Sequence, residues 1–279
     1  MPEAGDAAST PLMRQYHSIK QQVPNALLMF RLGDFYELFY QDAVTAAREL
    51  EITLTARNKE KGQPIPMCGV PFHAADGYLA RLIQKGYRVA VCDQMEEAGP
   101  GKKLVKREVT RVVTPGTAME PSLLRSHENN YLAAVCRNGA RAGLAHVDIS
   151  TGEFRATELD AAEVNAALEN LNVREVLAAE TVADLRGFRT TLEDWIFSLD
   201  YADRALREHF RLLTLDGCGL GGRPLAVSAA GAILHYLRDT QKSALDHLDR
   251  PAFYDRSDSM ILDAVTVRNL ELLEPLFAG

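Results

Sequence analysis

Two residues near the N-terminus, Phe35 and Glu37, place an aromatic ring and a carboxylate two positions apart in the segment Gly33–Phe39. Side chains two positions apart in extended backbone point the same way. The ring and the carboxylate are therefore expected to share one face. Burying an unpaired carboxylate is costly, which makes the two a poor core pair. Together they could contact something flat that carries hydrogen-bonding edges, such as a nucleobase.

The flanking residues predict the elements that position this pair. An apolar run over residues 26–32 predicts a buried strand, a Gly-Asp turn signal follows, and a helical pattern continues to about residue 51. Phe35 and Glu37 are thus expected at a corner where a strand gives way to a helix. Tyr36 lies on the opposite face and is expected to pack inward. A core position for Phe35, as for most phenylalanines, is the alternative.

The remainder of the chain predicts two mixed α/β units and the start of a third. The first unit is expected to hold helices at 12–23 and 74–85, strands at 52–56, 87–92 and 108–113, a charged loop at 57–63, and an irregular Pro/Gly-rich segment at 64–71. The second is expected to hold strands at 131–137 and 141–149 around an Asn-Gly turn, strands at 153–158 and 173–178, and helices at 160–171, 201–210 and 226–240. Three antiparallel strands followed by alternating helix and strand indicate a layer of ribonuclease-H type.

Charge divides the chain unevenly. The net charge is −7, but residues 1–115 carry 15 Lys+Arg against 13 Asp+Glu, whereas residues 116–279 carry 16 against 25. Such asymmetry suggests different tasks for the two parts, and an anionic partner is expected to prefer the first. A solvated surface without a partner explains the same numbers. The same two interpretations apply to a basic run made of Lys102, Lys103, Lys106 and Arg107.

The sequence offers no signal for a membrane, export or a metal centre. No apolar stretch approaches the ~20 residues that span a bilayer, and the acidic, polar start lacks a signal-peptide core. The four cysteines are scattered without metal-ligand or redox spacing, so reduced thiols are expected. Residues 260–276 predict a helix apolar enough to need a partner, which indicates a truncated chain; packing against the second unit is the alternative.

Several long segments in order resemble one family. MFRLGDFYELF, PIPMCGVPFHAADGYLARLIQKGYRVAVCDQ and LVKREVTRVVTPGT resemble the mismatch-binding domain of the MutS family of bacterial DNA mismatch repair proteins. DISTGEF, LRDTQKSALDHL and MILDAVTVRNLEL resemble the family's connector domain and the start of its lever helices. The resemblance covers nearly the whole chain. It implies a mixed-sheet α/β mismatch-binding domain over 1–117 with 1–11 disordered, a linker over 118–129, a ribonuclease-H-like connector over 130–254, and the beginning of a helical domain over 255–279.

The resemblance also assigns roles to residues. Phe35 matches an aromatic residue that stacks on the mispaired base from the minor-groove side, and Glu37 matches a glutamate that hydrogen-bonds that base. Arg57 matches an arginine that contacts the DNA backbone, with Lys59 as a further candidate; a solvated loop position is the alternative for both. Met67 is a candidate for packing against the minor groove, although core filling suits a methionine equally well.

The family's other properties define the expected partners. The implied ligand is double-stranded DNA with mismatches or small loops, and the connector implies contact with MutL. The sequence has no G-x-x-x-x-G-K-[ST], so no cofactor and no enzymatic activity are expected here. ATP, Mg²⁺ and a homodimer are expected only for a full-length member, and a monomer is expected for this chain. The implied location is the bacterial cytoplasm, in association with the nucleoid.

A metal-dependent nuclease in the second unit is a rival hypothesis. Such enzymes need several carboxylates that converge on metal ions. Asp148 and Glu153 flank one predicted turn, and Glu175 and Glu180 follow later, but no third strand-borne carboxylate joins the first two. A protein-docking module is the third hypothesis, compatible with the acidic balance of the second unit.

Overall fold

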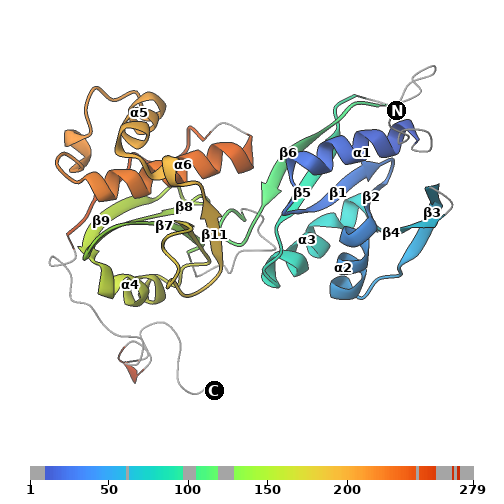
Figure 1. Ribbon diagram of the computed structural model, residues 1–279, viewed down its shortest axis with the longest axis horizontal. Helices are drawn as coiled ribbons and strands as arrows, with labels where there is room; N and C mark the ends of the chain where they lie inside the picture. Colours follow the sequence, from blue (N-terminus) through green and yellow to red (C-terminus); the bar gives the residue numbers. More distant parts are fainter. Residues whose placement is uncertain are drawn as a thin grey trace, which may run out of the picture. The chain divides into compact units, whose positions relative to one another are not determined.

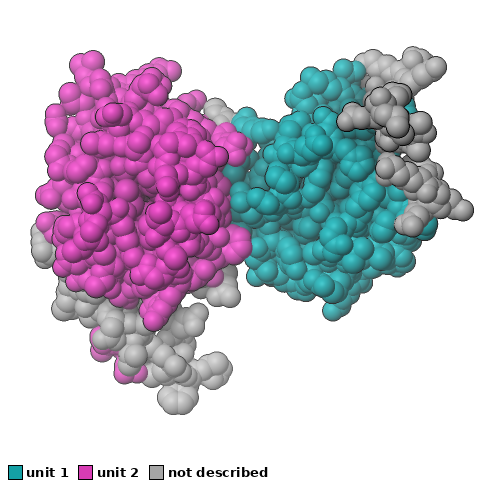
Figure 2. All heavy atoms as spheres, viewed as in Figure 1, with its two compact units in different colours: residues 1–126, 240–242 teal, residues 127–239, 243–279 magenta. Residues whose placement is uncertain are grey.

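The computed structural model describes residues 10–60, 63–96, 105–118, 129–242, 245–255, 266, 269 and 270, with 57–60 and 63 described by their backbone. The chain divides into two compact units, residues 1–126 with 240–242 and residues 127–239 with 243–279 (Figure 2). Each unit contains a six-stranded mixed sheet with helices on both faces (Figure 1). The predicted mixed α/β class is therefore confirmed.

Unit 1 is built on a sheet of order β3-β4-β2-β1-β5-β6, in which β1 and β5 are parallel and the other neighbours antiparallel. Helix α1 lies on one face, and α2 and α3 lie on the other (Figure 1). The elements are α1 Pro11–Gln22, β1 Leu27–Leu32, β2 Phe35–Phe39, α2 Tyr40–Leu50, β3 Thr55–Glu60, β4 Gln63–Pro71, a short 3-10 helix Phe72–Ala74, α3 Ala75–Gln84, β5 Val89–Gln94 and β6 Arg107–Val113.

A buried carboxylate joins three elements of unit 1. Thr10 caps α1 by accepting a hydrogen bond from Met13 N at 3.3 Å. Near the other end of α1, Lys20 Nζ lies 2.8 Å from Asp42 Oδ2 of α2. Asp42 Oδ2 also accepts from the backbone N of Leu28 in β1 at 3.0 Å. The pairing and the hydrogen bond offset the cost of burying this carboxylate, so α1, β1 and α2 are fixed to one another.

Two predictions about the strands beside Phe35 are wrong. Phe35 and Glu37 lie within β2, the second strand of a hairpin, and not at a strand-to-helix corner. The segment predicted as irregular, 64–71, belongs to strand β4. Its prolines at 64 and 66 are two positions apart, so their missing N–H groups face the same side. Strand β2 pairs with β4 only from residue 67 onward, so these prolines occupy the part of β4 with one neighbour, which strands tolerate.

Unit 2 has the sheet order β11-β10-β7-β8-β9-β12. Strands β7, β8 and β9 are antiparallel, and β10 lies parallel between β7 and β11, which confirms the predicted ribonuclease-H-type layer. Helices α5 and α6 cover one face and α4 covers the other (Figure 1). The elements are β7 Tyr131–Asn138, β8 Arg141–Asp148, β9 Phe154–Asp160, α4 Val164–Asn170, β10 Glu175–Ala179, β11 Arg189–Leu192, α5 Leu199–Phe210, α6 Pro224–Gln241, β12 Ala252–Phe253, and 3-10 helices Ala161–Glu163, Asp194–Phe197 and Asp216–Cys218.

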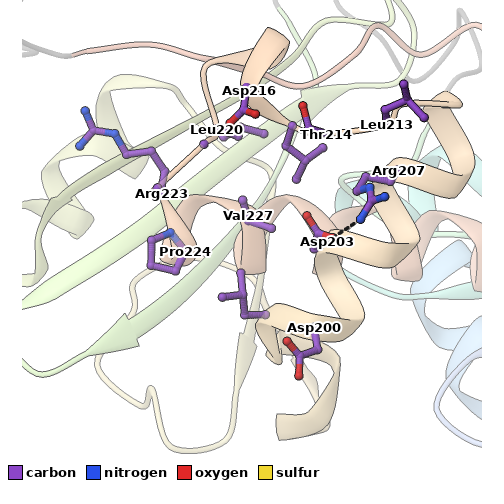
Figure 3. A pocket seen from close by; sticks show the side chains of 14 residues that line it. Asp200, Asp203, Arg207, Leu213, Thr214, Asp216, Leu220, Arg223, Pro224 and Val227 are labelled. Atoms are coloured by element: carbon purple, nitrogen blue, oxygen red, sulfur yellow. Dashed lines mark hydrogen bonds and ion pairs between the residues drawn. The ribbon is translucent and has the colours of Figure 1, made fainter.

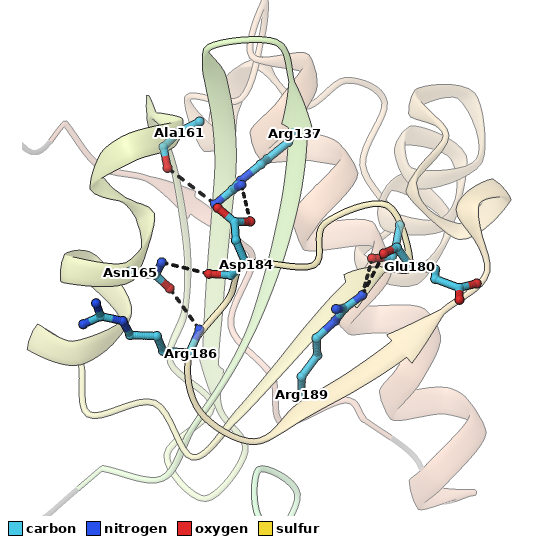
Figure 4. Close-up of polar contacts among 8 residues, drawn as sticks. Arg137, Ala161, Asn165, Glu180, Asp184, Arg186 and Arg189 are labelled. Atoms are coloured by element: carbon cyan, nitrogen blue, oxygen red, sulfur yellow. Dashed lines mark hydrogen bonds and ion pairs between the residues drawn. The ribbon is translucent and has the colours of Figure 1, made fainter.

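Polar side chains anchor the loop that leads into edge strand β11, which the sequence did not predict (Figure 4). Arg137 Nη1 of β7 lies 2.5 Å from Asp184 Oδ1. Asn165 of α4 donates from Nδ2 to Asp184 O at 3.1 Å and accepts from Arg186 N at 3.0 Å. The position of this edge therefore depends on specific contacts as well as on apolar alternation.

Several predictions fall outside the described residues. The predicted helix over 260–276 and most of the predicted linker over 118–129 belong to this group, as do Lys102 and Lys103. Within the described part of the chain, no helix has the length and apolar character needed to cross a membrane.

Candidate nucleic-acid interface

Phe35 is a large apolar side chain left at the surface of unit 1, where 47% of it is exposed. It begins β2, opposite Leu32 of β1 and Pro71 of β4. Phe39, four residues later and on the same strand face, is fully buried, and its ring lies 5.1 Å from that of Tyr16 in α1. Helix α1 thus covers the far end of β2 and leaves Phe35 open.

Glu37 lies between these two phenylalanines and shares their strand face. It is half-buried and lies opposite Gly69 of β4. A Cβ atom placed on Gly69 would be 3.7 Å from Glu37 Cγ and 3.9 Å from Phe35 Cδ1. The ring and the carboxylate therefore flank one bare stretch of backbone, and together the three residues form the surface that we call the Phe35 face.

Tyr36 points to the other side of the sheet, as predicted. It is 5% exposed, and its hydroxyl donates to Asp93 Oδ1 at 2.5 Å. Thr110 Oγ1 donates to the other oxygen of the same carboxylate at 2.7 Å. Burial first, and then the Asp93 hydrogen bond, raise the pKa of Tyr36. This contact joins β2 to β5 and β6 and so holds the strand that presents Phe35.

Two arginines brace the hairpin from opposite faces of the sheet: Arg31 lies on the Tyr36 side, and Arg107 lies on the α1 side, where its guanidinium carbon is 5.1 Å from the centroid of the Phe30 ring. The Arg31 guanidinium carbon lies 3.3 Å from the centroid of the Phe72 ring, and its Nε donates to Gly33 O in the hairpin turn at 2.5 Å. Arg107 Nε donates to Arg31 O at 2.7 Å. Arg107 is 7% exposed, so its interpretation as a solvated member of a basic run is wrong. Sequence reasoning missed this role because one charged run gives no sign of which member turns inward.

The remaining candidates lie on the strands beside β2. Met67 of β4 is half-buried and packs against the apolar cluster under α1. Arg57 of β3 is opposite Ile65 of β4, and Lys59 is opposite Pro64, with a register shift between the two cations. They lie in an edge strand and not in the predicted charged loop.

Three of the four carboxylates considered for a nuclease are engaged in other contacts, and the fourth, Glu180, is exposed. Asp148 accepts from Ser150 N at 2.9 Å and from Ser150 Oγ at 2.6 Å. Glu153 accepts from the Tyr131 hydroxyl at 2.8 Å. Glu175 is fully buried and accepts from two hydroxyl groups. Among the described residues, no three His, Cys, Asp or Glu side chains are grouped so that they could hold a metal ion.

Unit 2 also has an open hollow of about 660 Å³ beside α5 and the start of α6 (Figure 3). Leucine side chains line it together with three aspartates and two arginines. Arg207 and Asp203 form an ion pair across 3.2 Å within this lining. Charges of both signs give the hollow no electrostatic preference for an anionic partner, so the Phe35 face is the stronger candidate for nucleic acid.

Comparison with known proteins decides the family. The model of MutS domain I matches residues 10–122, and the model of MutS domain II matches residues 130–249. The chain belongs to the MutS family. The DNA mismatch repair protein MutS of Solibacter usitatus (strain Ellin6076) is 71% identical over 98% of this chain. The MutS proteins of Anaeromyxobacter dehalogenans (strain 2CP-C) and Dehalococcoides mccartyi (strain ATCC BAA-2266 / KCTC 15142 / 195) are both 47% identical, over 100% and 94% of it.

The match places the Phe35 face within MutS domain I and the buried carboxylates within MutS domain II. The chain spans 31–32% of the length of these MutS relatives. The geometry described above belongs to the N-terminal third of such a protein.

Proposed function

We propose that this chain binds mismatched double-stranded DNA, with Phe35 stacked on the mispaired base from the minor groove and Glu37 hydrogen-bonded to that base. The observation that carries the proposal is the 47% exposure of the Phe35 ring on a strand face shared with Glu37. Wedge side chains kink DNA by separating base steps, at a cost of a few kcal/mol per step. A mismatched step costs less to unstack, so the wedge converts deformability into specificity.

Glu37 sharpens this discrimination. A carboxylate near phosphates weakens binding to any duplex, because both carry negative charge. A displaced base that offers a donor compensates for this repulsion, whereas a paired base does not. The ring tests whether a base step yields, and the carboxylate tests whether the displaced base can be bound.

The proposal extends to the rest of the chain through the family. Arg57 and Lys59 are assigned to phosphates and Met67 to the minor groove. The mismatch-binding domain is assigned to 1–117, the linker to 118–129, the connector to 130–254 and the start of the helical domain to 255–279. The connector is proposed to contact MutL, and ATP, Mg²⁺ and the homodimer are assigned to the full-length protein in the bacterial cytoplasm.

The test replaces Phe35 and compares matched with mismatched duplex. Ring–base stacking contributes about 1–3 kcal/mol, so Phe35→Ala is expected to lose most of the preference for a mismatched duplex in a fluorescence anisotropy titration. Phe72→Ala is the matched control, because Phe72 is 48% exposed in the same unit and its ring contacts Arg31 and Tyr36 behind the hairpin.

Comparing the two variants shows whether the mismatch preference depends on Phe35 in particular or on any exposed aromatic ring of unit 1. Phe72→Ala is expected to keep the mismatch preference, and Phe35→Ala is expected to keep the melting temperature of the wild type, because a half-exposed ring contributes little to the core. Equal preference in the wild type and in Phe35→Ala would refute the proposed function.

A further inference from the structure

We infer that Gly69 is a specificity-determining contact residue whose bare backbone admits the edge of the displaced nucleotide between Phe35 and Glu37. The inference rests on the proposed function and adds a third member to the Phe35 face. It follows from three observations: the fold does not require glycine at this position, glycine weakens the strand, and the space beside it lies between the two recognition side chains.

The fold does require glycine elsewhere, which gives a standard for comparison. Gly33 in the hairpin turn has φ +59°, a conformation that other residues rarely adopt. Gly143 of β8 has ordinary backbone, but a Cβ there would lie 2.0 Å from Leu225 O, where no side chain fits. One glycine is demanded by conformation and the other by packing.

Gly69 meets neither demand. Its φ lies outside the left-handed region, and the atom nearest to a built Cβ is Tyr36 O at 3.6 Å, an ordinary van der Waals distance. Alanine would fit this strand without displacing a neighbour. Glycine in a strand interior weakens it and often marks a place where a ligand approaches the backbone closely. Glycine at position 69 therefore lowers the stability of the strand, and neither the backbone conformation nor the packing around it explains why glycine is there.

The position of the missing side chain indicates which ligand approaches. A methyl group on Gly69 would stand against Glu37 Cγ at 3.7 Å and Phe35 Cδ1 at 3.9 Å. Gly69 is half-buried, so the space in front of it is reached from solvent. A base that stacks on Phe35 and bonds Glu37 brings its sugar edge to this point. The first carbon of any side chain would occupy the space that the nucleotide must enter.

The experiment is Gly69→Ala in this chain, with matched and mismatched duplexes titrated by anisotropy and the melting temperature measured alongside. Mismatch affinity is expected to fall at least about fivefold, the lower end of what one lost stacking contact gives, with less change for matched duplex. The melting temperature is expected to stay the same or rise, because alanine restricts the unfolded chain more than glycine does. Gly77→Ala is the control: Gly77 is exposed in α3, nothing lies within 4 Å of its built Cβ, and binding is expected to stay at the wild-type level.

The outcomes distinguish a contact between Gly69 and the nucleotide from a requirement of the strand itself for glycine. A lower melting temperature for Gly69→Ala would show that the strand needs glycine and would overturn the inference. Wild-type mismatch affinity, or an equal loss on both duplexes, would overturn it as well. Phe35→Ala, measured in parallel, separates the two levels: if it loses discrimination and Gly69→Ala does not, the proposed function stands and this inference fails. If Phe35→Ala binds as the wild type does, both fail.

Discussion

Each of the two sheets carries a phenylalanine and a glutamate whose exposure differs sharply between the units. In unit 2, Phe154 is 2% exposed and Glu175 is fully buried. In unit 1, Phe35 is 47% exposed and Glu37 is half-buried beside it. Both sheets have helices on each face, but in unit 1 helix α1 covers Phe39 and leaves Phe35 exposed. An exposed ring beside a half-buried carboxylate is suited to contact with a ligand from outside the chain.

Glu175 shows which partners a carboxylate needs when it is fully buried in a sheet. Glu175 Oε1 accepts from Thr190 Oγ1 at 2.6 Å and from the Tyr236 hydroxyl at 2.7 Å. These donors come from β11 and α6, so the carboxylate joins three elements of unit 2. Buried polar groups need such partners. Glu37 is half-buried, and in the proposed function a base binds to it.

The largest expected effect comes from removing the buried carboxylate of Glu175. Glu175→Ala takes the acceptor from two hydroxyl groups and leaves a cavity, so the free energy of unfolding of unit 2 is expected to fall by about 3 kcal/mol or more. Glu180→Ala, at the exposed position just after β10, is expected to change it by less than about 0.5 kcal/mol. Trp195 is the single tryptophan and lies in unit 2, so its fluorescence in urea follows this unit alone. Equal urea midpoints would contradict the contrast between the sheets.

A second test uses low pH, which is expected to lower the free energy of unfolding of unit 2. His146 of β8 is 3% exposed, and burial lowers its pKa from 6.5 to about 4. Between pH 6.5 and 4, His146 binds a proton in the unfolded chain but stays neutral in the folded chain. The free energy of unfolding therefore falls as the pH falls through this window, and the full value returns above pH 6.5. The expected loss is about 3 kcal/mol for the full window.

Matched histidine variants check this source of acid sensitivity. His146→Phe keeps an aromatic ring beside Tyr131, whose ring lies 4.9 Å away, and removes the titrating group. Its tryptophan-detected urea midpoint is expected to depend less on pH between 6.5 and 4. His73→Phe, at an exposed position of unit 1, is expected to keep the wild-type pH dependence of unit 2. An unchanged dependence in His146→Phe would assign the acid sensitivity to other groups.

The smallest expected effect comes from removing the charge of the half-buried Glu37. Glu37→Gln removes a charge at a half-exposed position, where electrostatic contributions are about 1 kcal/mol or less. Matched duplex is expected to bind more tightly and mismatch discrimination to fall, because the repulsion that penalises paired DNA is gone. Glu51→Gln, an exposed residue after α2, makes the same charge change away from the Phe35 face. Unchanged discrimination in Glu37→Gln would refute the role given to this carboxylate.

Sequence reasoning succeeded where a pattern is local. Alternation along one strand correctly placed Tyr36 inward, and the Asn138-Gly139 signal correctly predicted the hairpin of β7 and β8. It failed where pairing is decided by distant residues. The prolines of β4 are tolerated because β2 ends beside them, and β11 and β12, with four and two residues, are too short to carry a pattern.

The candidate site shows the same division. Type and spacing made Phe35 and Glu37 candidates and the resemblance gave their proposed roles, while the structure adds that they share one face of strand β2. Gly69 carries no chemistry of its own and becomes visible only through the register that sets it opposite Glu37. The inward turn of Arg107 depends on a carbonyl group 76 residues away in sequence, which no local pattern encodes.

The edge of the unit 1 sheet has a consequence for behaviour at high concentration. Strand β3 is an edge strand, and its register with β4 shifts between Arg57 and Lys59. An exposed edge offers unpaired backbone groups to strands of other molecules, and natural sheets limit this with bulges and charged residues. A distorted edge rich in charge is a poor template for a further strand. Concentrated solutions are therefore expected to resist aggregation through this edge, even though β2, which is separated from the edge strand by β4, keeps Phe35 in contact with water.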